Sequence, residues 1–560
     1  MSKISGASII SRMLQGYGVT HVFYVPTILM RSLAEMDSLK IKKILTHSEK
    51  AAAYMADGYA RASGKPGLCL AQQIGATNLL SGLRDAFMAN SPVIAITGGS
   101  TNDSKYRNAY QEVEEFKQFD SMTKFNAEVN DTNRLPDLIR QSFRVATTGS
   151  PGPVHLRLMG LHGGTIADAV TDADISIEEK FKFSPPFRPV AHLDDINQAI
   201  ELLLKAERPI IVAGGGVIAS NAESELRKLA EKLQIPVATS LNAKASLNDA
   251  HSLNVGVVGT YSRSCANKAV FEADTVFFIG SQTGGQVTVN WKIPKSGTKV
   301  IQLDINPEEL GRNYSNAISL LGDAKSTLAE MYSKCIGKSL QPKIKWLNRV
   351  QELVTDWRKE NEKSMTSTAI PLRPERICRE ISESLPVDAV LVSDTGHSGM
   401  WTSQMIEIQH STQKFIRCAG SLGWGLPGAM GVKCALPERP VLCFTGDGGI
   451  YYHLSELETA ARFGINIVVI VNNNSSLNQE IPLVNAAYKG LNDDQSAEIW
   501  KFQKSVDFTK IAENFGCASF RVDKPGQLKD LLPNAFKMNR PVVIEVISDE
   551  NALSKTAWTP

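Results

Sequence analysis

The sequence has no long apolar run, no strong net charge and no paired cysteines, and each absence narrows the function. No stretch approaches the ~20 apolar residues that cross a bilayer, and Met1 to Ser5 lack the apolar core of a signal peptide. The formal charge is only +2, so no electrostatic footprint for nucleic acid is present. The eight cysteines are scattered without metal-site spacing, which favours reduced thiols and a cytoplasmic location.

What is present is a globular composition, 43% hydrophobic and 21% charged, over 560 residues, enough for about three or four domains. Short β-rich runs alternate with helix-forming segments, which predicts parallel sheets with helices on both faces. We therefore expect an α/β protein of three doubly wound parallel-sheet domains, at 1–185, 186–345 and 365–550. A charged helix over 343–363 connects the last two, and the polar segment 478–500 is expected to be a loop that serves as a lid or lies exposed to solvent.

The most informative stretch runs from Gly446 to Ser476. Gly446-Asp447-Gly448-Gly449 follows a β-rich run, and Asn474 follows a second apolar strand, 474 − 447 = 27 residues after Asp447. Because parallel strands end at one sheet edge, both turns lie where α/β sheets bind ligands. Carboxylate, amide and carbonyl oxygens suit Mg²⁺, and the glycines admit phosphate. The alternative is two ordinary turns with Asp and Asn as turn formers.

This pattern resembles the thiamine diphosphate signature, and other stretches extend the resemblance over nearly the whole chain. They are Glu49 to Arg61, Gly75 to Asn78, Tyr110 to Glu112, Thr123 to Phe125, and Ser421 to Pro427. The chain is most similar to the acetohydroxyacid (acetolactate) synthase branch, which also includes 2-hydroxyacyl-CoA lyase, oxalyl-CoA decarboxylase and benzaldehyde lyase. The resemblance implies thiamine diphosphate, Mg²⁺ and a small-molecule substrate. It also implies a homodimer or homotetramer, with the cofactor between the first domain of one subunit and the third of another.

The resemblance assigns roles to single residues. Glu49 matches the glutamate that hydrogen-bonds the cofactor's aminopyrimidine ring and favours the tautomer that removes the reactive proton; alternatively it is a helix N-terminal glutamate stabilised by the dipole. Leu422 matches the apolar residue that bends the cofactor, and the resemblance implies that Gly420 and Leu422 offer backbone groups to the pyrimidine. The cofactor-binding set implied by the resemblance is Pro26, Glu49, Thr395, His397, Ser398, Gly420, Leu422, Gly446, Asp447, Gly448, Gly449, Asn474 and Ser476, with Asp447, Asn474 and Ser476 on the metal.

Two loops on the substrate side depart from the family pattern. Pro26-Thr27-Ile28 replaces Pro-Gly-Gly, and Gln73-Ile74-Gly75 replaces Gly-Pro-Gly. Gln73 and Gln111 are therefore expected, with Glu49, to act in catalysis or contact a substrate oxygen, against the alternative of structural polar groups. Because Gln73 adds a donor and an acceptor, we expect a polar 2-oxo or 2-hydroxyacyl compound, rather than pyruvate, as the best substrate.

The central domain also departs from the nearest relatives. Ser281 to Gly285 replaces the arginine-bearing segment that contacts flavin, so FAD is not expected, while Gly214 to Gly216 and Asp304 leave ADP or CoA open. The expected function is a thiamine diphosphate- and Mg²⁺-dependent carbon–carbon lyase or ligase, similar to acetolactate synthase, acting on a 2-oxo acid or related carbonyl compound. The alternatives are a 2-hydroxyacyl-CoA lyase or acyl-CoA decarboxylase, and a non-catalytic cofactor-binding subunit.

Overall fold

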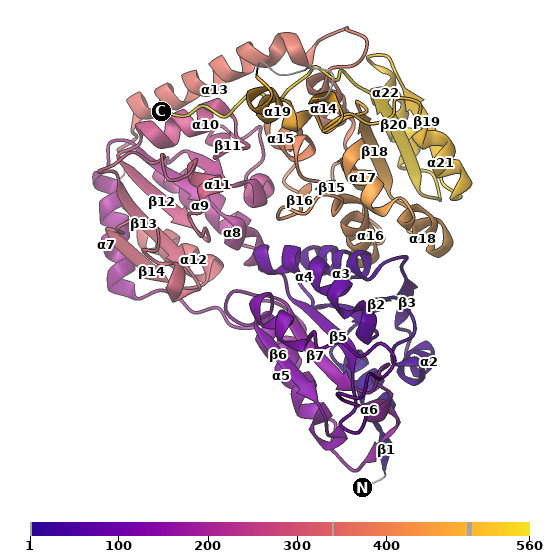
Figure 1. Ribbon diagram of the computed structural model, residues 1–560. Helices are drawn as coiled ribbons and strands as arrows, with labels where there is room; N and C mark the ends of the chain where they lie inside the picture. The colour runs from indigo at the N-terminus through magenta and orange to yellow at the C-terminus, as the bar shows by residue number, and fades with distance from the viewer. Residues whose placement is uncertain (1–2, 339–340, 490–495) are drawn as a thin grey trace.

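Three six-stranded parallel sheets follow one another along the chain, each covered by helices (Figure 1). The computed structural model describes residues 3–338, 341–489 and 496–560. The architecture confirms the expected α/β class with three doubly wound units; the boundaries near 185, 345 and 365 stay predictions. Within the described ranges, no helix is both long and apolar enough to span a membrane.

The first sheet has the strand order β3-β2-β4-β5-β7-β6. Its strands β4, β5 and β7 are buried along their whole length, as strands covered on both faces must be. A short antiparallel pair, β1 (Ile4–Ser5) with β8 (Val170–Thr171), lies apart from it. The strands are β2 (His21–Tyr24), β3 (Lys42–Leu45), β4 (Gly67–Ala71), β5 (Val93–Gly99), β6 (Phe125–Val129) and β7 (Val154–Met159). The helices are α1 (Gly6–Gly16), α2 (Met30–Ser38), α3 (Glu49–Ser63), α4 (Ala76–Met88), α5 (Leu135–Thr147) and α6 (Gly164–Asp168).

The central sheet has the order β11-β10-β9-β12-β13-β14, which is that of dinucleotide-binding folds. Its strands are β9 (Pro209–Ala213), β10 (Val237–Thr239), β11 (Asn254–Val257), β12 (Thr275–Ile279), β13 (Lys299–Asp304) and β14 (Ile318–Leu321). The helices are α7 (Leu193–Lys205), α8 (Gly215–Ala219), α9 (Glu223–Leu233), α10 (Ser264–Glu272), α11 (Gly285–Thr288) and α12 (Ala324–Cys335). The connecting helix α13 (Ile344–Met365) agrees closely with the expected 343–363.

The third sheet has the order β16-β15-β17-β18-β20-β19. When the strands of each unit are numbered in chain order, this is 2-1-3-4-6-5, the same as in the first sheet. Its strands are β15 (Val390–Ser393), β16 (Lys414–Arg417), β17 (Val441–Gly446), β18 (Val468–Asn473), β19 (Ala518–Val522) and β20 (Val542–Ile547). The helices are α14 (Pro374–Ser384), α15 (His397–Gln404), α16 (Gly425–Ala435), α17 (Asp447–Ile450), α18 (Glu456–Phe463), α19 (Ile481–Ala487), α21 (Phe508–Asn514) and α22 (Gln527–Ala535).

Residues 451–463 of the third unit form a 3₁₀ turn, Tyr451–His453, followed by α18. One local expectation beside them needs correction. The loop expected over 478–500 begins as a 3₁₀ turn, Asn478–Glu480, and then forms α19, because Pro482 occupies the first helical turn, where its missing N–H has no partner to lose. Residues 490–495 of that segment lie outside the described residues.

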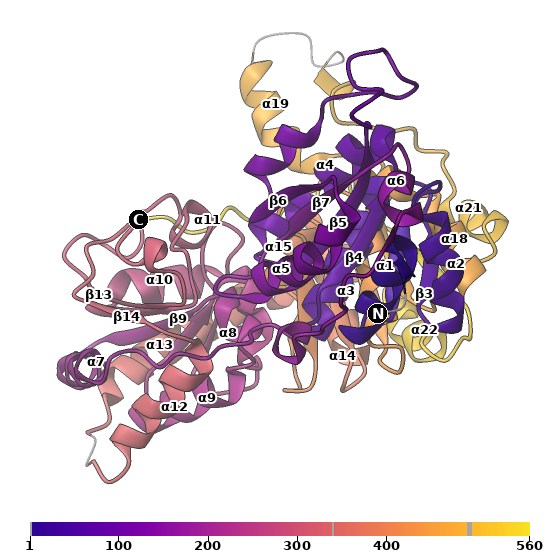
Figure 2. The ribbon, with the colours of Figure 1, turned by 90° about the horizontal axis from the view of Figure 1, so that it is seen from below.

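The first and third units pack through α3 and α16, and glycines let these helices approach closely. A Cβ at Gly58 would lie 2.1 Å from the carbonyl oxygen of Gly428, and one at Gly431 would lie 2.0 Å from that of Met55. Only glycine permits such backbone contact. Figures 1 and 2 show the central unit to one side of this pair.

The C-terminal segment crosses between units. After β20, residues 549–560 leave the third unit and end beside α10 of the central unit (Figure 1). There the Trp558 ring packs edge-on against Phe271, with ring centroids 5.6 Å apart. The Trp558 carbonyl accepts a hydrogen bond of 2.9 Å from the Asn267 amide. The segment therefore links two units through specific contacts.

Candidate functional site

Loops at the carboxyl edge of the third sheet enclose a cavity of about 270 Å³. They follow β15, β16, β17 and β18, and the neighbours β15 and β17 mark the switch point at which open α/β sheets bind ligands. Every third-unit residue of the expected cofactor set except Gly420 lines this cavity. These residues are Thr395, His397, Ser398, Leu422, Gly446, Asp447, Gly448, Gly449, Asn474 and Ser476.

Asp447 and Asn474 converge on the backbone of Ser476. Asp447 is only 3% exposed, and its two carboxylate oxygens accept N–H groups from Gly448 (2.8 Å) and Ser476 (3.0 Å). Burial raises the pKa of this carboxyl to about 6, against the opposing effect of the backbone N–H bonds. The Asn474 side-chain oxygen accepts from both the N–H (3.1 Å) and the hydroxyl (2.9 Å) of Ser476.

The donors at this position suit a hard cation. One carboxylate, one amide and one carbonyl are oxygen ligands of the kind Mg²⁺ takes together with phosphate. Among the described residues, no cluster of three or more His, Cys, Asp or Glu side chains forms a different metal centre. The chemistry of the donors therefore fits the magnesium–diphosphate hypothesis.

Two glycines of the Gly446 to Gly449 turn, Gly448 and Gly449, are closely packed. A Cβ at Gly448 would lie 2.5 Å from a Leu477 methyl carbon, and one at Gly449 would lie 2.5 Å from the Thr445 hydroxyl. On the same cavity wall, the side-chain oxygen of Asn472 is buried with no hydrogen-bond partner in the described chain. The cavity thus combines close backbone access with an unpaired polar atom, which fits a polar ligand such as a diphosphate.

Asp394 was missed as a functional candidate, although it connects three of the four loops. It is buried at the end of β15 and accepts N–H groups from Thr395 (2.7 Å), Gly423 (3.1 Å) and Gly425 (3.1 Å), and the Thr445 hydroxyl (3.1 Å). Burial raises its pKa to about 6, with the hydrogen bonds opposing. The available signal was an aspartate directly after a buried strand.

His397 lines the cavity, and both of its ring nitrogens face protein groups. Nδ1 lies 2.6 Å from the Asn478 side-chain oxygen, and Nε2 accepts from the Ser554 N–H at 3.4 Å. The Asn478 amide in turn donates to the carbonyls of Glu550 (3.1 Å) and Ala552 (3.3 Å). Burial lowers the pKa of His397, against the Asn478 bond, so the ring is neutral at pH 7. The C-terminal segment therefore helps to shape the cavity wall.

The remaining candidates form a separate group at the carboxyl edge of the first sheet. Pro26, Glu49, Gln73 and Gln111 follow β2, β3, β4 and β5, respectively. Glu49 begins α3, and its carboxylate accepts from the Asn78 amide at 3.3 Å. None of the four lines the third-unit cavity in the described part of this chain.

Gln73 points into the first unit rather than into open space. It is 2% exposed, and its amide nitrogen donates to the Ser100 hydroxyl (2.9 Å) and the Val113 carbonyl (3.0 Å). Gln111 lies on the loop thus tethered, with a left-handed φ of 63° and a buried side-chain oxygen that has no partner among the described residues. The placement makes Gln73 a tether of the loop and leaves an unpaired acceptor on Gln111.

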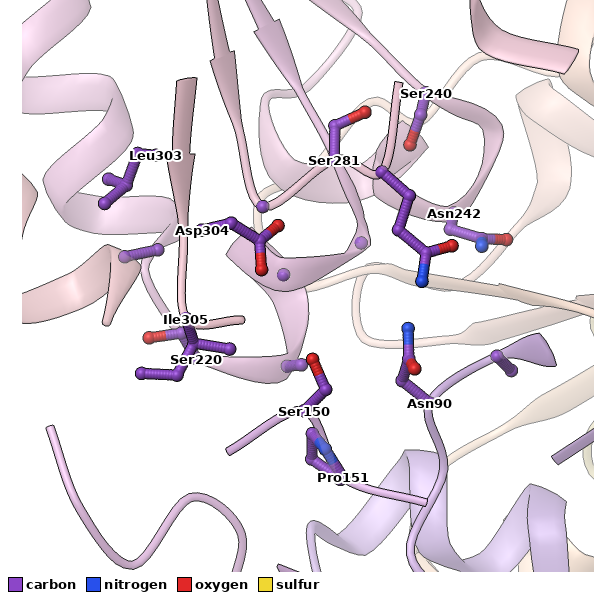
Figure 3. Close-up of a pocket in the computed structure, with 18 of the residues that line it drawn as sticks. Asn90, Ser150, Pro151, Ser220, Ser240, Asn242, Ser281, Leu303, Asp304 and Ile305 are labelled. Carbon is purple, nitrogen blue, oxygen red and sulfur yellow. The ribbon is translucent and has the colours of Figure 1, made fainter. Parts of the chain in front are cut away.

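A second cavity, of about 280 Å³, lies at the switch point of the central sheet, between the loops after β9 and β12 (Figure 3). The two loops touch, since a Cβ at Gly214 would lie 2.1 Å from the Gly280 carbonyl oxygen. Asp304 ends β13 at the cavity, and burial raises its pKa to about 6. Asn90 and Ser150 of the first unit form the opposite side (Figure 3).

The lining of this second cavity is poor in positive charge. Among the described residues that line it, Arg417 is the one cationic side chain. Its guanidinium donates to the carbonyl of Cys418 and, at 3.2 Å, to the side-chain oxygen of Gln286. Asp304 and Asp323 contribute carboxylates to the same lining. The cavity therefore offers hydroxyl, amide and carboxylate groups, with one cation already bonded.

Comparison with known proteins gives matches along the chain. Three models of thiamine pyrophosphate enzymes match: the N-terminal TPP binding domain at residues 4–120, the central domain at 196–331 and the C-terminal TPP binding domain at 394–546. A probable acetolactate synthase large subunit of Methanocaldococcus jannaschii is 33% identical over 98% of this chain and 92% of its own length. A probable acetolactate synthase large subunit of Methanococcus aeolicus is 32% identical over 91% of this chain and 86% of its own length. The acetolactate synthase large subunit of Buchnera aphidicola subsp. Acyrthosiphon pisum is 29% identical over 95% of this chain and 92% of its own length.

Proposed function

The chain belongs to the thiamine pyrophosphate enzyme family, and from this membership we propose that it makes or breaks a carbon–carbon bond of a 2-oxo acid with Mg²⁺ and thiamine diphosphate. It is a thiamine diphosphate-dependent enzyme similar to acetolactate synthases. The observation that carries the proposal is the third-unit cavity, in which Asp447, Asn474 and Ser476 converge.

Each part of this cavity has a proposed task. Asp447, Asn474 and the Ser476 carbonyl hold Mg²⁺, and the Gly446 to Gly449 turn and Ser398 face the diphosphate. Leu422 supports the bent cofactor, which when bound supplies the reactive carbon and the electron sink. His397 contributes shape rather than charge, because it is neutral and bonded at both nitrogens.

Glu49 completes the site from a second copy of the chain. This proposal is supported by the absence of Glu49 from the cavity lining in the described part of the chain, and by exposed apolar side chains elsewhere in the first unit: Met30, Ile74 and Tyr106 are 52%, 48% and 86% exposed. Apolar side chains gathered at one functional edge favour association. We propose a homodimer as the smallest active form.

Subunit mixing tests this arrangement. Glu49→Gln and Asp447→Ala chains, each with its own affinity tag, are co-expressed and the mixed dimer is isolated. Neither variant alone has a complete site, whereas the mixed dimer pairs an intact Glu49 with an intact Asp447 in one of two sites. Recovery of activity only in the mixed dimer is expected; an inactive mixed dimer would contradict completion by the partner.

The central cavity is proposed to bind an adenine nucleotide without flavin. The neutral and acidic lining favours a nucleotide with an unmodified ribose near Asp304, such as ADP, over CoA, which carries an additional phosphate. The one cation of the described lining, Arg417, already donates a hydrogen bond to Gln286 and is not free to bind that phosphate. Purified protein should be colourless, and ADP should bind more tightly than CoA in calorimetry. Flavin absorbance released on denaturation, or tighter binding of CoA, would contradict this and favour the flavin or acyl-CoA alternatives.

A substrate screen of the Mg²⁺-loaded holoenzyme tests the main proposal. Pyruvate, 2-oxo acids with polar side chains and 2-hydroxyacyl-CoA esters are compared for carbon dioxide release and for new hydroxyketone products. Turnover of a 2-oxo acid, with a polar one preferred over pyruvate, is expected. Turnover of the CoA esters alone identifies the acyl-CoA alternative, and tight cofactor binding without any turnover identifies a non-catalytic subunit.

A further inference from the structure

A carboxylate of the first unit holds the third-unit loop that carries Gly420 and Leu422. Asp85, on α4, is fully buried and accepts three consecutive backbone N–H groups. They belong to Ala419 at 2.7 Å, Gly420 at 3.2 Å and Ser421 at 3.0 Å. The contact joins residues more than 330 positions apart in the chain.

Two residues of α3 extend the contact. Arg61 donates to Asp85 at 3.0 Å and to Asp57 at 2.6 Å, and it also donates to the Arg417 carbonyl at 2.5 Å. The Asp57 carboxylate accepts from the Trp424 ring nitrogen at 2.9 Å. Arg61 and the two buried carboxylates, Asp57 and Asp85, thus bind the third-unit segment at both ends of the loop and along its middle.

This loop is held from two sides. Asp85 binds its first three amides, and Asp394 of the third unit binds the amides of Gly423 and Gly425. Hydrogen bonds to a buried carboxylate are among the stronger ones in proteins, because they are charge-assisted and shielded from water. The peptide planes that carry the N–H groups of Ser421 and Gly423, one on each side of Leu422 in the chain, are therefore fixed in orientation before any ligand binds.

We propose that Asp85 is a positioning residue for the pyrimidine end of the cofactor: it orients Gly420 and Leu422 across the boundary between the first and third units. The inference rests on the proposed function, which assigns thiamine diphosphate to the cavity beside this loop. The diphosphate end depends on the loops after β15, β17 and β18, whereas the hydrogen bonds of Asp85 to the third unit, among the described residues, all go to the loop after β16. Loss of Asp85 therefore affects one end of the cofactor and spares the other.

The test compares two probes on Asp85→Asn, which keeps the shape of the side chain but replaces one acceptor oxygen with a donor. Dissociation constants for thiamine diphosphate and for inorganic diphosphate are measured by calorimetry with Mg²⁺ in excess. The thiamine diphosphate constant should rise at least about tenfold, the loss expected for a charged hydrogen bond. The inorganic diphosphate constant should change less than about twofold, since a factor of two is well under 1 kcal/mol.

Asp137→Asn provides the matched control, because Asp137 pairs with Arg134 on the outer face of α5; it should change neither constant. Hydrogen exchange of the 417–424 peptide should quicken in Asp85→Asn alone. Equal weakening of both probes, or no change in either, would overturn the proposal. Wild-type protein that binds inorganic diphosphate but not thiamine diphosphate would instead count against the proposed function.

Trp424→Phe keeps the inference testable where Asp85→Asn does not fold. This substitution retains a ring but removes the N–H that Asp57 accepts. It should raise the dissociation constant for thiamine diphosphate by a smaller factor than Asp85→Asn does, and it should leave the dissociation constant for inorganic diphosphate unchanged. Parallel loss of both probes in this variant would contradict the proposal.

Discussion

The first and third units share one strand order and differ in what their loops carry. In the first unit, side chains after successive strands offer a carboxylate and amides, at Glu49, Gln73 and Gln111. In the third, glycines, backbone N–H groups and buried carboxylates enclose a cavity. The same topology thus presents the same sheet edge twice, and the loops alone decide whether that edge binds or reacts.

The difference extends to how complete each edge is. The third unit closes its cavity with groups from its own sheet, from the C-terminal segment and, through Asp85, from the first unit. The first-unit edge leaves Glu49 partly exposed and Tyr106 in solvent. We therefore expect substitutions in the third unit to lower cofactor affinity, and those in the first to lower turnover.

The largest effect is expected for Asp447→Ala. The substitution removes the one carboxylate among the proposed metal ligands, so cofactor should no longer be retained through gel filtration with Mg²⁺. Asp530→Ala, an exposed aspartate on α22 of the same unit, is the control and should retain cofactor. Tight cofactor binding by Asp447→Ala without metal would remove the binding role from the third unit.

Glu49→Gln should show the opposite profile. Positioned proton transfer contributes about 10²–10⁴-fold to rates, so turnover should fall within that range while cofactor affinity stays within a few-fold of wild type. Exchange of the cofactor's reactive proton, followed by NMR after acid quench, should slow in parallel. Glu179→Gln, at the surface of the first unit, is the control. If the cofactor's reactive proton exchanged at the wild-type rate in Glu49→Gln, the proposed contrast between a reacting first unit and a binding third unit would be wrong.

Gln73→Ala should give an intermediate effect through the loop that carries Gln111. The substitution leaves the Val113 carbonyl and the Ser100 hydroxyl, which lie on an exposed and a partly buried residue, without their Gln73 donor, a loss of about 0.5–1.5 kcal/mol for each hydrogen bond. kcat/KM for the preferred substrate should fall by the corresponding factor, and more than for pyruvate. Gln118→Ala, exposed in the same unit, should leave both unchanged. An unaltered substrate ranking in Gln73→Ala would exclude a role in specificity.

The smallest effect concerns pH and Asp394. Burial raises its pKa to about 6 in the folded protein, from an ordinary value of 3.8, so the folded state takes up a proton in this range before the unfolded state does. This group therefore adds stability as pH falls from 6 towards 4, by about 1 kcal/mol per pH unit. The unfolding temperature of the cofactor-free wild type, relative to that of Asp394→Asn, should therefore rise as the pH falls over that range. A difference that stays constant with pH would contradict this.

Local features of the site were predictable from sequence. The Asp447 turn and Asn474 each follow a buried strand, so alternation of apolar runs and glycines was sufficient to place them at one edge. Ser48 caps α3 through the Ala51 N–H, as its position before an alanine-rich run indicates. These features depend on neighbours within a few residues or within one strand–helix–strand unit.

Long-range features were not predictable in this way. Asp85 and Asp394 look like ordinary aspartates in sequence, and their roles arise from partners brought together by folding. Gln73 was expected to face the substrate, yet its carboxamide bonds to a loop 27 to 40 residues later. No local pattern encodes which way a polar side chain turns when both directions offer partners.

The C-terminal segment, which is translated last, completes one wall of the third-unit cavity. Ser554 faces His397, and the carbonyls of Glu550 and Ala552 hold Asn478, so one wall of the cavity depends on residues translated after all three sheets. A nascent chain halted before residue 550 has the strands and the glycine turn but lacks these contacts. We therefore expect cofactor capture to follow synthesis of this segment, and a chain truncated before residue 550 to bind the cofactor more weakly than the full chain.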